Sequence, residues 1–242
     1  MQILIIGGNS DIGFEIAKEF YKNNNNNLYL TTQPNKKITK DINQLKNHKN
    51  RLKLIKFDLL EFNDHKKFYN ALDPKPDLVI CSAGMFLNSE QILSNFELKE
   101  KMINTNFTGY ASILDIIIDD FKRKNNGCII GISSVAGDRG RASNYMYGST
   151  KSAFSSYLSG LRNSLKKFNI NIITIKPGFV KTKMTNNIKM NKYLTATPEK
   201  VAKDVHKAWK RKKDIVYTPW YWKYIIIIIK IIPEKIFKKM NL

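Results

Sequence analysis

The chain has few of the side chains that build disulfide frameworks and metal sites. Only two of its 242 residues are cysteines, Cys81 and Cys128, and each lies near the end of an expected strand, where small buried side chains are common. We therefore expect two buried thiols and no disulfide. The three histidines, His48, His65 and His206, are scattered without the spacing of metal ligands, which argues against zinc chemistry.

The sequence also lacks the apolar stretch that a membrane-spanning helix requires. The run from Tyr224 to Ile229 is far shorter than the roughly 20 residues needed to cross a bilayer. The opening residues 1–6 have no basic region before their apolar stretch and run straight into glycines, which is typical of a buried strand and not of a secretory signal. We therefore expect a cytoplasmic protein.

Acidic residues are scarce: 20 Asp and Glu stand against 41 Lys and Arg, which gives a net charge of +21. Such a charge favours anionic partners, namely nucleic acid, an acidic membrane or phosphorylated ligands, and by itself it does not choose among them. No recognisable nucleic-acid module accompanies it, so we expect no nucleic-acid partner.

What the chain does have is a regular alternation of apolar runs and helical patterns. It predicts one domain with a three-layer α/β/α fold, in which helices cover both faces of a doubly wound parallel sheet. Sites then lie at the carboxyl ends of the strands. We expect this domain over residues 1–190, followed by a basic, aromatic extension over residues 191–242. The expected strands are residues 2–6, 28–32, 52–57, 77–82, 127–132 and 170–176, and the long helices are 99–124 and 144–168.

A glycine turn follows the first strand and opens a helix. It reads Gly7-Gly8-Asn9-Ser10-Asp11-Ile12-Gly13. Backbone amides at such a helix start face a pyrophosphate, and glycine lets the phosphate approach closely. The alternative is a tight strand-to-helix turn that binds nothing.

The second strand ends without the acidic residue that usually binds the ribose hydroxyls of NAD. The segment instead contains Thr31, Thr32 and Gln33, followed by Lys36 and Lys37, and these groups could accept a 2′-phosphate. NADP(H) is therefore the favoured cofactor, although the arginine that usually binds this phosphate is missing too, and NAD stays open.

Tyr147 and Lys151 are four residues apart in an expected helix, so they lie on one face. A free phenol with a pKa of about 10 is a poor acid at neutral pH, and a fixed cation nearby lowers that value. A hydroxyl such as that of Ser134, beside the same reacting oxygen, can stabilise developing charge there. The alternative is an ordinary amphipathic helix with a surface tyrosine and lysine.

Taken in order, these motifs resemble those of the short-chain dehydrogenase/reductase family over residues 1–185. Ile6 and Asp11 depart from the family's T-G-x-x-x-G-I-G turn, and Cys81-Ser82 replaces the first half of its N-N-A-G motif. The resemblance implies a Rossmann-like fold, with Asn106, Ser134, Tyr147 and Lys151 as the catalytic residues. It implies cofactor binding by Gly7, Asn9, Ser10, Asp11, Ile12, Gly13, Thr32, Gln33, Asp58, Leu59, Ala83, Gly84, Tyr147, Lys151, Pro177, Gly178, Val180 and Thr182.

The resemblance implies an NADP(H)-dependent oxidoreductase that acts on CH–OH groups and reduces a ketone to an alcohol. Tyr147 would donate the proton and Ser134 would hold the reacting oxygen. Lys151 would bind the nicotinamide ribose and depress the tyrosine pKa, while Asn106 would hold a water that links the lysine to solvent. A nucleotide-sensing module without turnover is the alternative, and the intact proton relay argues against it.

The tail from Tyr217 to Pro233 combines aromatic residues, an isoleucine cluster and flanking lysines, as interfacial anchors do. The glycine turn Gly7 to Gly13, the stretch Tyr147 to Lys151, the loop Lys176 to Met184 and the tail most resemble the decaprenylphosphoryl-2-keto-ribose reductase branch of the family. This implies a keto-sugar on a polyprenyl-phosphate lipid, cell-wall or polysaccharide biosynthesis, and peripheral contact at the inner face of the membrane. Alternatively, the substrate is a soluble or acyl ketone, and the tail covers the substrate cleft or joins copies in the homo-oligomer that we expect.

Overall fold

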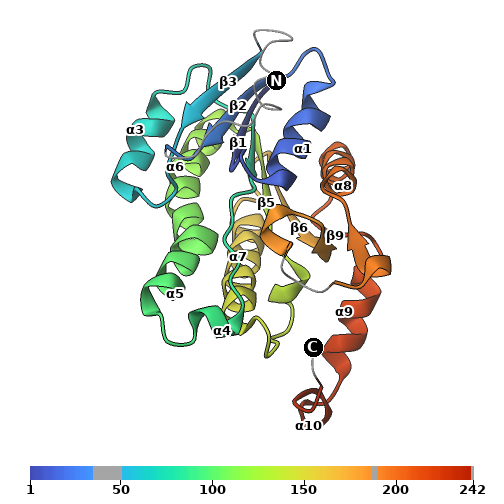
Figure 1. Cartoon of the computed structure of the whole chain (residues 1–242). Coiled ribbons are helices and arrows are strands. Elements are labelled where there is room, and N and C mark those ends of the chain that lie inside the picture. Colours follow the sequence, from blue (N-terminus) through green and yellow to red (C-terminus); the bar gives the residue numbers. More distant parts are fainter. Residues whose placement is uncertain (35–50, 187–189, 241–242) are drawn as a thin grey trace.

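A computed structural model describes residues 1–34, 51–186 and 190–240 of the chain. Within them, one sheet has seven parallel strands in the order β3-β2-β1-β4-β5-β6-β9 (Figure 1). The order runs outward from β1 in both directions, so the sheet is doubly wound and the predicted α/β fold is confirmed. The strands are β1 (Gln2–Ile6), β2 (Asn27–Thr32), β3 (Leu52–Lys56), β4 (Leu78–Cys81), β5 (Gly127–Ile132), β6 (Ile170–Pro177) and β9 (Ile215–Thr218).

Helices cover both faces of the sheet because its central strands are apolar on both sides. Along β1, Ile3 and Ile5 pack into one core, while Leu4 and Ile6 pack into the other. Cys81 and Cys128 are free thiols and belong to these cores, as predicted. The first core is covered by α1 (Asp11–Tyr21) and α8 (Pro198–Lys210), and the second by α3 (His65–Asn70), α6 (Gly109–Lys124) and α7 (Tyr145–Ser164) (Figure 1).

The helix expected over residues 99–124 is present but is not α-helical throughout. It starts earlier as α5 (Phe96–Ile103), widens into a π turn at Asn104–Thr108 and continues as α6. Gly109 lets the start of α6 approach Leu59 closely, since a Cβ there would lie 2.6 Å from the Leu59 carbonyl oxygen. The short elements between the main ones are α4 (Ser89–Ile92) and 3₁₀ turns at Phe62–Asp64, Val135–Gly137, Lys183–Thr185 and Lys192–Leu194.

Part of the predicted extension is built into the domain. Strand β9 pairs with β6, and α8 buries Val201, Ala202 and Val205 against the first core. Only the segment after β9, with α9 (Trp222–Ile231) and α10 (Glu234–Phe237), lies beyond the sheet (Figure 1). A small second sheet pairs β7 (Phe179–Val180) with β8 (Thr195–Ala196). Among the helices of the described residues, none has the length and apolar character to cross a membrane.

Candidate functional site

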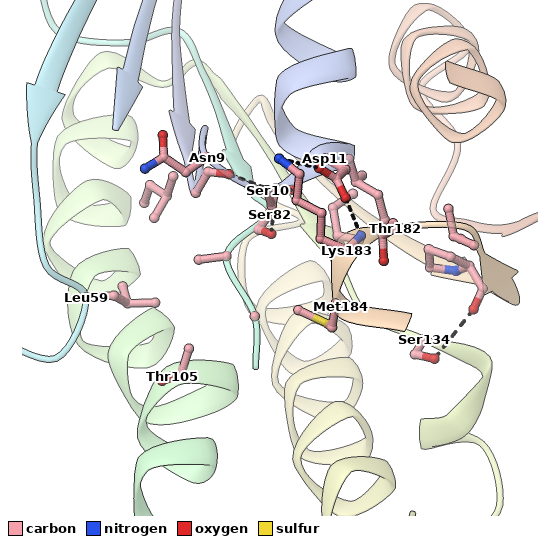
Figure 2. A pocket seen from close by; sticks show the side chains of 18 of the residues that line it. Asn9, Ser10, Asp11, Leu59, Ser82, Thr105, Ser134, Thr182, Lys183 and Met184 are labelled. Atoms are coloured by element: carbon pink, nitrogen blue, oxygen red, sulfur yellow. Dashed lines mark hydrogen bonds and ion pairs between the residues drawn. The ribbon is translucent and has the colours of Figure 1, made fainter. Parts of the chain in front are cut away.

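A cavity of about 480 Å³ opens where the strands of the sheet end, and Figure 2 shows side chains that line it. The fold brings most of the predicted site residues together there. Those that line the cavity are Gly7, Asn9, Ser10, Asp11, Ile12, Gln33, Asp58, Leu59, Ala83, Gly84, Ser134, Tyr147, Lys151, Pro177, Gly178, Val180 and Thr182.

Three predicted residues do not line the cavity. Gly13 lies within α1 behind the turn, and Asn106 is completely buried. Thr32 is also buried, and its neighbour Thr31 lines the cavity instead, because successive side chains of a strand point to opposite faces. The lysines expected to bind a 2′-phosphate, at positions 36 and 37, lie outside the described residues.

The glycine turn is held in a conformation that leaves no space for a side chain at Gly7. Its φ is +94°, and a Cβ there would lie 2.3 Å from the Ala83 nitrogen. Ser10 caps α1: its Oγ accepts from the Gly13 N–H at 3.0 Å and donates to the Gly7 carbonyl at 2.8 Å. Asp11 and Ile12, the first residues of α1, line the cavity, so the amino end of this helix could face an anionic ligand.

The polar groups near the turn fit a dinucleotide. Both side-chain polar atoms of Asn9 are buried and have no hydrogen-bond partner within the described part of the chain. Thr31 accepts a hydrogen bond from the Gly7 N–H at 3.0 Å, and Gln33 lines the same end of the cavity. A ribose or phosphate could satisfy the Asn9 amide, since a buried polar group without a partner is costly.

Three residues with groups that can donate or accept a proton line the cavity away from the glycine turn. Ser134 follows β5, while Tyr147 and Lys151 lie one turn apart in α7. The Lys151 Nζ lies 5.8 Å from the centre of the Tyr147 ring and donates to the Ile132 carbonyl at 3.0 Å. The Ser134 Oγ accepts from the Ala136 N–H at 3.1 Å and lines the same cavity as Tyr147. Serine and tyrosine hydroxyls are thus positioned to contact one substrate oxygen.

Burial is the main cause of the pKa shifts of Tyr147 and Lys151. It raises the pKa of Tyr147 to about 12, against the opposing effect of the nearby Ser134 hydroxyl. It lowers the pKa of Lys151 to about 8. The prediction that Lys151 lowers the tyrosine pKa is not met, because the loss of water around the phenol raises that pKa instead. Tyr147 therefore keeps its proton at neutral pH, as a proton donor must.

Asn106 has a different set of contacts from the predicted water site. Its Oδ1 accepts from the Met85 N–H at 2.8 Å, and its Nδ2 donates to the Met85 carbonyl at 2.8 Å and to the Thr150 hydroxyl at 3.0 Å. The side chain therefore ties the segment after β4 to α7. Its predicted role in a water relay stays a prediction.

Several residues that line the cavity are not among those predicted from the sequence. Ser82 was noted only as a departure from a motif, and its Oγ lies 3.1 Å from that of Ser10. Thr105 belongs to the unpredicted π turn. Three more follow β7: Lys183, Met184 and Thr185. The run Thr182-Lys183-Met184 next to the Pro177-Gly178 loop was the available signal for this group.

Comparison with known proteins agrees with the fold and with these motifs. A family profile described as short chain dehydrogenase matches residues 1–192. An uncharacterized oxidoreductase of Mycobacterium tuberculosis is 29% identical over 139 residues, which are 57% of this chain and 55% of that protein. The chain thus matches about half the length of that relative.

Two further proteins are similar over more of their length. The NADP-dependent 3-hydroxy acid dehydrogenase of Schizosaccharomyces pombe is 26% identical, with 88% of each chain covered. A short-chain dehydrogenase of Sphingobium yanoikuyae, solved in complex with NADPH, superposes with a TM-score of 0.81 at 18% identity and covers 96% of both chains. With the profile spanning most of its length, the chain belongs to the short chain dehydrogenase family.

Proposed function

We propose that the protein is an NADP(H)-dependent oxidoreductase that reduces a ketone to an alcohol. The observation that carries this proposal is the convergence of Ser134, Tyr147 and Lys151 on a cavity that begins at the glycine turn. The family match supports the same reaction class. A cofactor bound in this cavity would supply the hydride.

The residues of the chain would supply the proton and the orientation. Tyr147, protonated at neutral pH, would donate to the alkoxide oxygen, and the Ser134 hydroxyl would hold that oxygen by a hydrogen bond. Lys151 would hold the nicotinamide ribose with its ammonium group. The turn from Gly7 to Ile12 would bind the pyrophosphate, with Asp58 and Leu59 beside the adenine and the loop Pro177 to Thr182 beside the nicotinamide.

A preference for NADPH over NADH is the first result we expect. Thr31 and Gln33 line the cavity at the end of β2, where an NAD site would carry a carboxylate. The named cofactors of the yeast relative and of the Sphingobium complex support the same choice. Titration of nicotinamide fluorescence should give a dissociation constant at least about tenfold lower for NADPH, or about 1.4 kcal/mol. Tighter binding of NADH would contradict the preference.

For the substrate, we propose a keto-sugar on a polyprenyl-phosphate lipid, reached at the inner face of the membrane. The support is α9, where Ile227, Ile228 and Ile231 are 49%, 59% and 74% exposed. Exposed lysines flank them: Lys223, Lys230 and Lys235. An apolar face edged with lysines suits anionic lipid, and the net charge of +21 acts in the same direction. The buried Trp222 joins this helix to the catalytic domain by packing on Gly178.

Vesicle flotation tests the membrane contact. Removal of residues 217–242 would take away part of β9, so we choose the triple change of Ile227, Ile228 and Ile231 to serine. We expect at least a tenfold loss of binding to anionic vesicles, because three apolar side chains leave the interface. Phe96→Ser is the matched control, since Phe96 is 73% exposed on α5, away from this lysine-flanked face.

Two results would reject the membrane contact in favour of the second candidate, a soluble or acyl ketone. One is unchanged flotation of the triple variant. The other combines two findings: the wild type does not bind vesicles, and light scattering shows a smaller oligomer for the triple variant than for the wild type. Those findings would make α9 an interface between copies. The substrate itself is tested by nicotinamide absorbance with the oxidised polyprenyl-phosphate pentose and each cofactor in turn.

A further inference from the structure

Asp11 occupies a position where the family's glycine turn has glycine, and its carboxylate contacts a distant segment of the chain. Oδ2 accepts a hydrogen bond from the Lys183 backbone N–H at 2.6 Å, although the two residues are 172 positions apart. Oδ1 lies 3.7 Å from the Lys183 Nζ. Figure 2 shows both contacts, with Asp11 at the start of α1 and Lys183 beside it.

The segment that Asp11 contacts is the short turn after β7. Its residues Thr182 to Thr185 line the cavity. The turn is closed on itself, because the Thr185 Oγ1 accepts from the Thr182 N–H at 3.0 Å and donates to the Val180 carbonyl at 2.7 Å. These bonds lie within residues 180–185 and do not connect the turn to another segment of the chain. The bond to Asp11 fixes the turn to the glycine loop.

The backbone hydrogen bond is the stronger of the two contacts. The Lys183 side chain is 76% exposed, and an ion pair so open to water contributes little. The Asp11 side chain is 23% exposed, and a hydrogen bond to an ionised carboxylate is about twice as strong as a neutral one. Substitution of the lysine side chain therefore leaves most of the contact in place, whereas loss of the Asp11 carboxylate removes it.

We propose that Asp11 is a positioning residue that fastens the turn Thr182 to Thr185 across the cofactor cavity and so slows dissociation of a bound dinucleotide. This inference rests on the proposed function, namely that the cavity binds NADP(H). A ligand lying between the glycine turn and this segment leaves readily only when the two edges separate. That separation breaks the bond between Asp11 and the Lys183 N–H.

Stopped-flow displacement of NADPH, followed by its fluorescence, tests this role on the full chain. We expect Asp11→Ala to raise the dissociation rate about tenfold or more, the effect of losing one charge-assisted hydrogen bond. The association rate should change much less, because the bond forms after the ligand has entered. Asp11→Asn keeps an acceptor oxygen and should restore a large part of the slow dissociation. Lys183→Met keeps the backbone N–H and should have a smaller effect than Asp11→Ala.

Glu15→Ala is the matched control. Glu15 lies on the same helix and pairs with Lys18 at 2.8 Å, without lining the cavity, so its loss tests α1 stability alone. Equal dissociation rates for wild type and Asp11→Ala would overturn the inference. So would an effect of Glu15→Ala or Lys183→Met as large as that of Asp11→Ala. Failure of the wild type to bind either dinucleotide would instead reject the proposed function.

Discussion

Tyr147→Phe should lower the rate of ketone reduction about a thousandfold while NADPH still binds. The phenol is the group placed to donate the proton, and a positioned general acid contributes about 10² to 10⁴ in rate. Its pKa of about 12 keeps the proton on the oxygen across the neutral range, so the wild type is ready to donate. Phenylalanine preserves the ring, including its edge-to-face contact with Phe86 at 5.0 Å. The loss would therefore be chemical and not structural.

The measurement separates binding from chemistry. NADPH fluorescence should give a dissociation constant within about threefold of the wild type, or about 0.7 kcal/mol. Single-turnover absorbance should show the loss in the reduction step. Tyr145→Phe is the control, since Tyr145 opens the same helix and is 41% exposed. A wild-type rate for Tyr147→Phe would reject Tyr147 as the acid, and equal losses in both variants would point to damage of α7.

Local sequence was enough to predict most of the sheet. The inner strands are short runs of isoleucine, leucine and valine that no helix periodicity explains, so β1, β4 and β5 were found within a residue or two. Strand β9 was missed because Ile215 to Thr218 is short, lies at the sheet edge and merges into the aromatic tail. Its assignment depends on pairing with β6, which is a long-range contact.

The same limit applies to the site. The spacing of Tyr147 and Lys151 predicted their common face, because helix geometry is local. It did not predict their pKa values, since these depend on burial contributed by the whole fold. The π turn was hidden because a single wide turn barely alters an apolar pattern. The contact of Asp11 with Lys183 joins residues 172 positions apart, so only the structure could provide it.

Lys151→Met should abolish turnover and yet stabilise the protein at pH 7. Lys151 is 4% exposed, and its neighbours do not offset the loss of water around its ammonium group, which lowers its pKa from 10.5 to about 8. That difference corresponds to about 3 kcal/mol of destabilisation when the group is charged in the folded protein. Methionine removes the charge but also the hydrogen bond to the Ile132 carbonyl, worth about 1 kcal/mol. We expect a net gain of about 1 to 2 kcal/mol in the free energy of unfolding.

The stability difference between the wild type and Lys151→Met should depend on pH. Because the folded protein binds the Lys151 proton less tightly than the unfolded chain, the stability of the wild type rises between about pH 8 and pH 10.5 from this group. The variant has no such rise, so its advantage should shrink over that range and reverse near pH 10.5, where only the lost hydrogen bond counts. Urea unfolding of both proteins at pH 7 and at pH 10 measures the difference, in which other titrations largely cancel.

Lys176→Met is the comparison variant, for which we expect a loss of stability and not a gain. Lys176 is also buried, at 9% exposure, but its Nζ lies 2.6 Å from the Asp138 carboxylate. Its removal leaves that carboxylate with the Tyr217 hydroxyl at 3.1 Å and with Lys230 at 3.7 Å, so we expect destabilisation of about 1 to 3 kcal/mol at pH 7. Loss of stability in Lys151→Met as well would mean that the Lys151 charge is compensated in the folded protein. The desolvation cost that we assign to the Lys151 charge would then be absent.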